Sequence, residues 1–138
     1  MDLADAKLYC EYISSYICKE EGHEPLLLDF RDIKASWARY DQNLITMSHG
    51  WCQYRKQVVF AVMIHEVCHF LHYRDYQLAK TNGGNFPYIG HGLRFKEYER
   101  KWLKHFGMRP IYSKAYWHTL TDLNGNVLYD KRYDARSV

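Results

Sequence analysis

The 138-residue chain contains no apolar run long enough to cross a membrane. Residues 1–5 lack the basic region of a secretory signal peptide, so we expect an intracellular protein with no membrane partner. No C-x-x-C pair occurs among the four cysteines, which excludes a zinc ribbon and favours reduced thiols packed as small apolar groups. Internal repeats and low-complexity segments are also absent. The length fits a single domain, 1–138, and the 47% hydrophobic content is enough for a real core.

Three segments have the apolar spacing that is typical of amphipathic helices. The first, 3–19, starts after Asp2, a residue type that caps helix N-termini. The other two are predicted at about 54–73 and 91–106. Between them lies a polar, glycine-containing loop over 74–90, and loops of this length in compact domains are usually functional or mobile.

Strands are predicted where short apolar segments are bounded by turn-forming residues. The expected strands lie at 26–30, 37–40, 44–48, 116–120 and 127–131. The last two flank Asn124-Gly125, a strong hairpin signal. We therefore expect an α+β domain in which a short antiparallel sheet packs with the three helices, followed by a C-terminal hairpin.

The segment His65-Glu66-Val67-Cys68-His69 has the pattern H-E-x-x-H inside the second predicted helix. Two histidines four residues apart lie one helical turn above each other, so both imidazoles can reach one metal ion. Glu66 would then face a water on that metal and act as its general base. Zn²⁺ is the metal that suits neutral imidazole and lowers the pKa of bound water. The alternative is a buried helix whose histidines are only hydrogen-bonded.

A catalytic zinc site needs a third protein ligand and one open position. The remaining histidines are His23, His49, His72, His91, His105 and His118. His72 is expected at the rim, whereas His91 heads the apolar stripe of the third predicted helix. We therefore predict His91 as the third ligand. The donor that stabilises an oxyanion stays open among His72, Tyr73, Tyr88 and Arg94.

Two motifs together resemble the SprT-like, or Spartan-like, zinc metalloprotease domain. They are H-E-x-x-H at 65–69 and Gly-His-Gly-Leu-Arg-Phe at 90–95, where the family has G-H-G-x-x-F/W. The resemblance covers roughly residues 5–110 and leaves 111–138 as a hairpin extension, without the cysteine zinc ribbon of many relatives. It implies a small zincin-like fold and a zinc endopeptidase acting on a protein or peptide substrate. In it, His65, His69 and His91 would bind Zn²⁺, and Glu66 would be the general base.

The segment between His91 and His118 is basic, with seven Lys and Arg against two Glu, a net charge of +5. Spartan-type relatives degrade proteins crosslinked to DNA, so we expect a monomer that binds single-stranded or distorted DNA beside the site. The cations proposed for this contact are Arg94, Arg100, Lys101 and Lys104. A solvated basic helix face explains the same charges equally well. Two other functions stay open, a DNA-binding module with structural zinc and a repressor-cleaving peptidase of the ImmA type.

Overall fold

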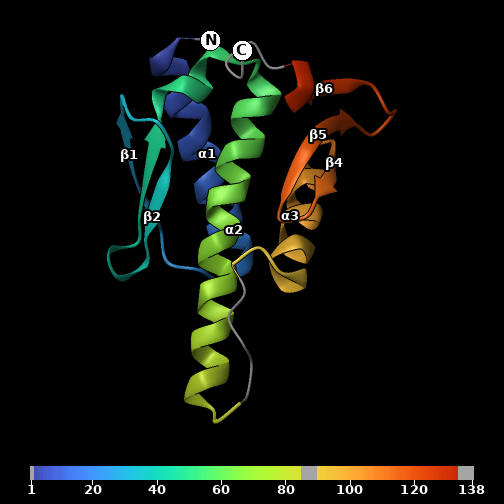
Figure 1. Cartoon of the computed structure of the whole chain (residues 1–138). Coiled ribbons are helices and arrows are strands. Elements are labelled where there is room, and N and C mark those ends of the chain that lie inside the picture. Colours follow the sequence, from blue (N-terminus) through green and yellow to red (C-terminus); the bar gives the residue numbers. More distant parts are fainter. Residues whose placement is uncertain (1, 85–89, 134–138) are drawn as a thin grey trace.

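The computed structural model describes residues 2–84 and 90–133 (Figure 1). The helix α2 (Lys56–Thr81) runs through the middle of the molecule. One small sheet lies on one side of it in this view, while α3 (Leu93–His105) and a second sheet lie on the other. The helix α1 (Leu3–Glu21) packs along α2. The predicted α+β class is confirmed.

The first sheet contains β1 (Leu27–Arg31), β2 (Trp37–Arg39) and β3 (Leu44–Ser48) in the order β1-β3-β2. The pair β2–β3 is antiparallel, as predicted, whereas β1 pairs with β3 in parallel, so the sheet is mixed. The strand β3 buries most of its side chains and lies at the centre of the sheet. There its backbone N–H and C=O groups pair with a neighbour on both sides, and β2 lies at the border.

The second sheet contains β4 (Met108–Ser113), β5 (Tyr116–Asp122) and β6 (Val127–Asp130) in that order. The predicted β5–β6 hairpin is present, and Gly125 has the positive φ of 89° that its turn requires. The strand β4 was not among the expected strands, and it contains Pro110. Pro110 lies on an edge strand, where its missing N–H is tolerated.

Two helix boundaries differ from the prediction. The helix α2 continues to Thr81, so the first half of the expected 74–90 loop is helical, while 85–89 lies outside the described residues. Contacts with distant segments support these polar turns: Arg74 donates to the Glu21 carbonyl at 2.6 Å, and Tyr98 donates to Asp75. The helix α3 starts at Leu93, so His91 precedes that helix and does not head its stripe.

The core is formed by buried side chains of α1, α2 and β3. The helix α3 packs directly on α2 and adds its own buried side chains to this core. All four cysteines are buried and free, in agreement with the expectation of packed thiols. In the part of the chain that is described, no helix is both long and apolar enough to span a membrane.

Candidate metal centre

The structure brings His65, His69 and His91 together. His65 and His69 lie one turn apart on α2, and His91 reaches them from the segment that leads into α3. One ring nitrogen from each lies within 4.8 Å of the others, and the Nε2 atoms of His65 and His91 are 3.3 Å apart. Two nitrogens bound to a tetrahedral zinc at ~2.05 Å lie roughly 3.3 Å from each other, so the His65–His91 pair has the spacing of two zinc ligands.

Phe95 holds the two helices in this arrangement. Its side chain is fully buried on the first turn of α3. The Phe95 ring centroid lies 5.0 Å from that of His65, 4.5 Å from that of His69 and 5.1 Å from that of His91. Because one rigid ring packs against all three imidazoles, the position of α3 on α2 determines how the three rings meet.

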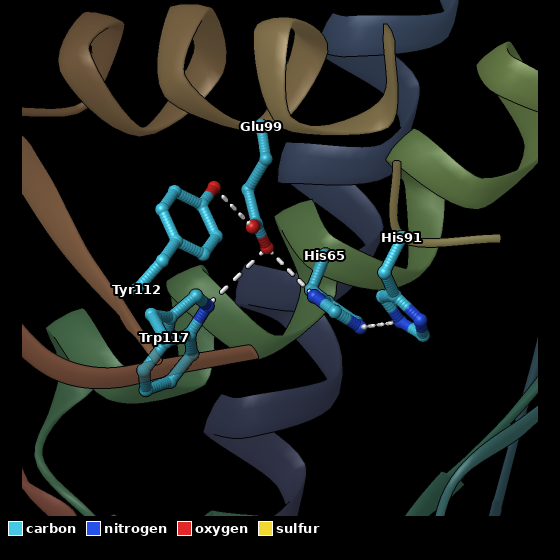
Figure 2. A network of polar contacts seen from close by, with 5 residues as sticks. All are labelled: His65, His91, Glu99, Tyr112 and Trp117. Carbon is cyan, nitrogen blue, oxygen red and sulfur yellow. Dashed lines mark hydrogen bonds and ion pairs between the residues drawn. The ribbon is translucent and has the colours of Figure 1, made fainter. Parts of the chain in front are cut away.

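Glu99 is a buried carboxylate that sequence reasoning missed. Its Oε2 lies 2.6 Å from Nδ1 of His65, and it accepts hydrogen bonds from Tyr112 and Trp117 (Figure 2). A signal for it exists in the sequence, because Glu99 follows Phe95 by four residues and therefore falls on the buried stripe of α3. A carboxylate on such a stripe needs partners, which identifies it as a candidate for a role at the site.

The environment keeps two of the three imidazoles neutral. Burial, followed by the neighbouring imidazoles, lowers the pKa of His69 to about 2. The same two causes lower the pKa of His91 to about 4. The pKa of His65 is raised, in contrast to the other two. Burial acts to lower this pKa, but the hydrogen bond and the charge of Glu99 have the larger combined effect. Neutral His69 and His91 retain a nitrogen lone pair for a metal at neutral pH.

The three histidines and Glu66 line one cavity of about 580 Å³ between β2 and the second sheet. Burial raises the pKa of Glu66, which is largely hidden from solvent at the cavity wall. Much of the remaining wall is aromatic, formed by Trp37, Tyr40, Trp51, Tyr116, Trp117 and Tyr129. A concave apolar wall with a few convergent polar groups is typical of a site that binds a ligand.

Three of the four residues considered for the oxyanion do not line this cavity. His72, Tyr73 and Arg94 are absent from its lining among the described residues, and Tyr88 lies outside them. His72 is buried, which corrects its expected position at the rim. Tyr116 lines the cavity instead, with its ring centroid 4.4 Å from that of His91. It comes from β5, and no local pattern links it to the motif helix.

The cations expected to bind DNA have other neighbours. Arg94 contacts Asp75 at 3.4 Å, Lys101 pairs with Glu21, and the Arg100 guanidinium lies 4.9 Å from the centre of the Tyr112 ring. None of these residues, nor Lys104, belongs to the cavity lining in the described chain. Trp102 is buried and cannot stack on bases. DNA binding stays a prediction.

Replacing His91 with Ala should reduce the bound zinc. We expect about one zinc per wild-type chain by elemental analysis after dialysis, and much less in His91→Ala, because two imidazoles hold the ion far less tightly than three. His105→Ala is the matched control, since His105 ends α3 outside the cluster and should retain the metal. Full retention of zinc with unchanged affinity in His91→Ala would remove His91 from the site.

Comparison with known proteins yields one distant likeness. No family model matches the chain, and no curated protein matches it in sequence. Among solved structures, it is similar to the metallopeptidase zymogen of Pyrococcus abyssi abylysin, with 17% identity and a TM-score of 0.48. The similarity covers 71% of this chain and 88% of that chain. A similarity this distant shows nothing about the function of this chain.

Proposed function

We propose that this chain is a zinc-dependent endopeptidase of the SprT-like type. The observation that carries the proposal is that His65, His69, His91 and Glu66 line the same cavity. Structural zinc sites are closed by four protein ligands, whereas catalytic sites combine three with an open position. The described residues offer a cluster of three histidines beside a cavity large enough for a peptide side chain, which favours catalysis over a structural role.

Each group has a distinct role in this proposal. A zinc ion held by the three imidazoles would polarise the scissile carbonyl and lower the pKa of a water. Glu66 would accept the proton of the attacking water and pass it to the leaving amine. Its raised pKa suits this exchange, since a carboxyl poised closer to neutral pH can both take and return a proton. The edge strand β2 borders the cavity, where an extended peptide can add a strand.

The finer parts of the proposal rest on the resemblance of two motifs to SprT-like proteases. The same resemblance favours this type over an ImmA-type peptidase, because the Gly90-His91-Gly92 segment matches it. DNA-crosslinked proteins as the natural substrates rest on the resemblance alone. The four cations Arg94, Arg100, Lys101 and Lys104 do not line the cavity within the described chain, so the proposed mechanism assigns no role to DNA.

Removal of the metal tests the proposal. We expect chelation followed by dialysis to abolish cleavage of an unfolded protein such as casein, and addition of one equivalent of zinc to restore it. Far-ultraviolet circular dichroism of the metal-free protein serves as the control for folding. The proposal fails if metal-free protein cleaves casein at the original rate. It also fails if zinc-loaded, folded protein cleaves none of a panel of unfolded proteins and peptides.

A further inference from the structure

Glu99 lies on α3 and contacts side chains from three other elements at the metal centre. Its side chain is fully buried on α3, and its partners are His65 on α2, Tyr112 on β4 and Trp117 on β5 (Figure 2). Two of the three partners therefore come from the C-terminal sheet and lie within 111–138, the predicted extension beyond the protease core. Trp117 also lines the cavity, so the same side chain contacts Glu99 and the site that a substrate would occupy.

The hydrogen bonds around Glu99 determine which nitrogen of His65 carries the proton. An indole N–H can only donate, so Oε2 of Glu99 accepts from Trp117 Nε1 at 3.2 Å. The same oxygen lies 2.6 Å from Nδ1 of His65. Because a carboxylate oxygen can only accept, Nδ1 carries the proton and donates a hydrogen bond to it. The lone pair of His65 is then on Nε2, the nitrogen that lies 3.3 Å from Nε2 of His91. Without Glu99, the ring proton could occupy Nε2 and block the nitrogen needed for a metal.

We propose that Glu99 is the positioning residue of the metal centre, and that Tyr112 and Trp117 make the C-terminal sheet part of it. The inference rests on the proposed zinc site. Glu99 makes its hydrogen bond to the cluster through His65, whereas Nδ1 of His69, among the described residues, is buried without a hydrogen-bond partner. Glu99 thus orients the ring of His65, the first histidine of the motif. Carboxylates that orient metal-bound histidines commonly change metal affinity 10–100-fold when they are removed.

Tyr112 and Trp117 in turn hold Glu99. Tyr112 donates to Oε1 at 2.6 Å and Trp117 to Oε2, so the carboxylate cannot rotate away from His65 without breaking both bonds. Burial, then the charge of Glu99, raises the pKa of Tyr112, so its hydroxyl stays protonated and donates. An amide at position 99 would offer one acceptor oxygen where the carboxylate offers two, and it cannot accept from all three donors.

The experiment compares zinc affinity, measured by chelator competition, in Glu99→Gln, Tyr112→Phe and Trp117→Phe with the wild type. A second readout, the ¹⁵N shifts of the His65 ring in metal-free protein, reports its tautomer. We expect zinc binding about 10–100-fold weaker in Glu99→Gln, with His65 no longer held as the Nδ1–H tautomer, and smaller losses in the other two. Tyr98→Phe is the matched control, because it removes a tyrosine–carboxylate bond, to Asp75, that contacts no histidine of the cluster. It should leave both readouts unchanged.

Each outcome of this experiment either supports or overturns the proposed role of Glu99. Folded Glu99→Gln with wild-type zinc affinity and an unchanged His65 tautomer would overturn the proposal. If that variant fails to fold, Tyr112→Phe and Trp117→Phe decide, and unchanged readouts in both would overturn it. Equal losses in Tyr98→Phe would also overturn it, by showing a general effect of packing. A wild type that binds zinc but cleaves nothing would refute the peptidase while leaving the role of Glu99 intact.

Discussion

Changing Glu66 to Gln is expected to lower the rate of proteolysis by at least about 10²-fold, the usual scale for losing a general base. The amide preserves the size of the side chain but cannot take a proton from water. His65, His69 and His91 are untouched, so zinc content should match the wild type. Because burial disfavours the charged form of Glu66, the neutral amide should not reduce thermal stability.

The measurement is the rate of casein cleavage by zinc-loaded variants, with metal content and melting temperature determined on the same samples. Glu97→Gln is the matched control: it makes the same chemical change at an exposed position on α3, outside the cavity lining. We expect its rate to equal that of the wild type. Cleavage at the wild-type rate by purified Glu66→Gln would contradict the mechanism, because no other carboxylate lines the cavity in the described chain.

Changing Phe95 to Ala is expected to reduce the free energy of unfolding by about 3–5 kcal/mol, the usual cost of removing a buried aromatic ring. Phe95 is fully buried, and its ring packs against His65, His69 and His91 at the junction of α2 and α3. Such a loss is a large part of the ~5–15 kcal/mol by which domains are stable. Zinc affinity should fall as well, because the ring that positions the imidazoles is gone.

Denaturant titration of the metal-free protein isolates the effect on stability from the effect on zinc binding. Leu93→Ala is the control on the same helix: Leu93 is 71% exposed, and its loss should change the free energy of unfolding by no more than about 0.5 kcal/mol. Phe95→Leu, which keeps an apolar side chain, should lie between the two. A loss below ~1 kcal/mol in Phe95→Ala would show that the helix junction does not depend on this ring.

Local spacing was sufficient to place the features that depend on neighbours along one helix or turn. A periodicity of 3.6 residues places His65 and His69 on the same face of α2, whatever the rest of the fold does. Asp2 caps α1 by accepting from the Asp5 amide, and Gly125 forms the β5–β6 turn, because both depend on residues within a few positions. His91 was chosen for its place on a helix stripe. It lies before α3 but still reaches the cluster.

Contacts between distant segments were not predictable in this way. The extension of α2 to Thr81 depends partly on Glu21 and Tyr98, which lie far from it in the chain. The order β1-β3-β2 places the most buried strand of this sheet at its centre with β1 parallel to it, which is a property of the assembled sheet. These features arise from packing, and the free energy of packing depends on all the segments that meet at one place.

Some residues of the candidate site were likewise predictable from local sequence, and others depend on tertiary packing. His65, His69 and Glu66 follow from a pattern five residues long. Glu99 contacts His65, and Tyr116 contacts His91, only when α3 and the second sheet fold against α2. Tyr112 and Trp117 come from the same sheet and bond to Glu99. The local sequence pattern therefore predicts the chemistry of the site. Its orientation and its walls exist only in the folded chain, because they are formed by side chains that are close in space and distant along the chain.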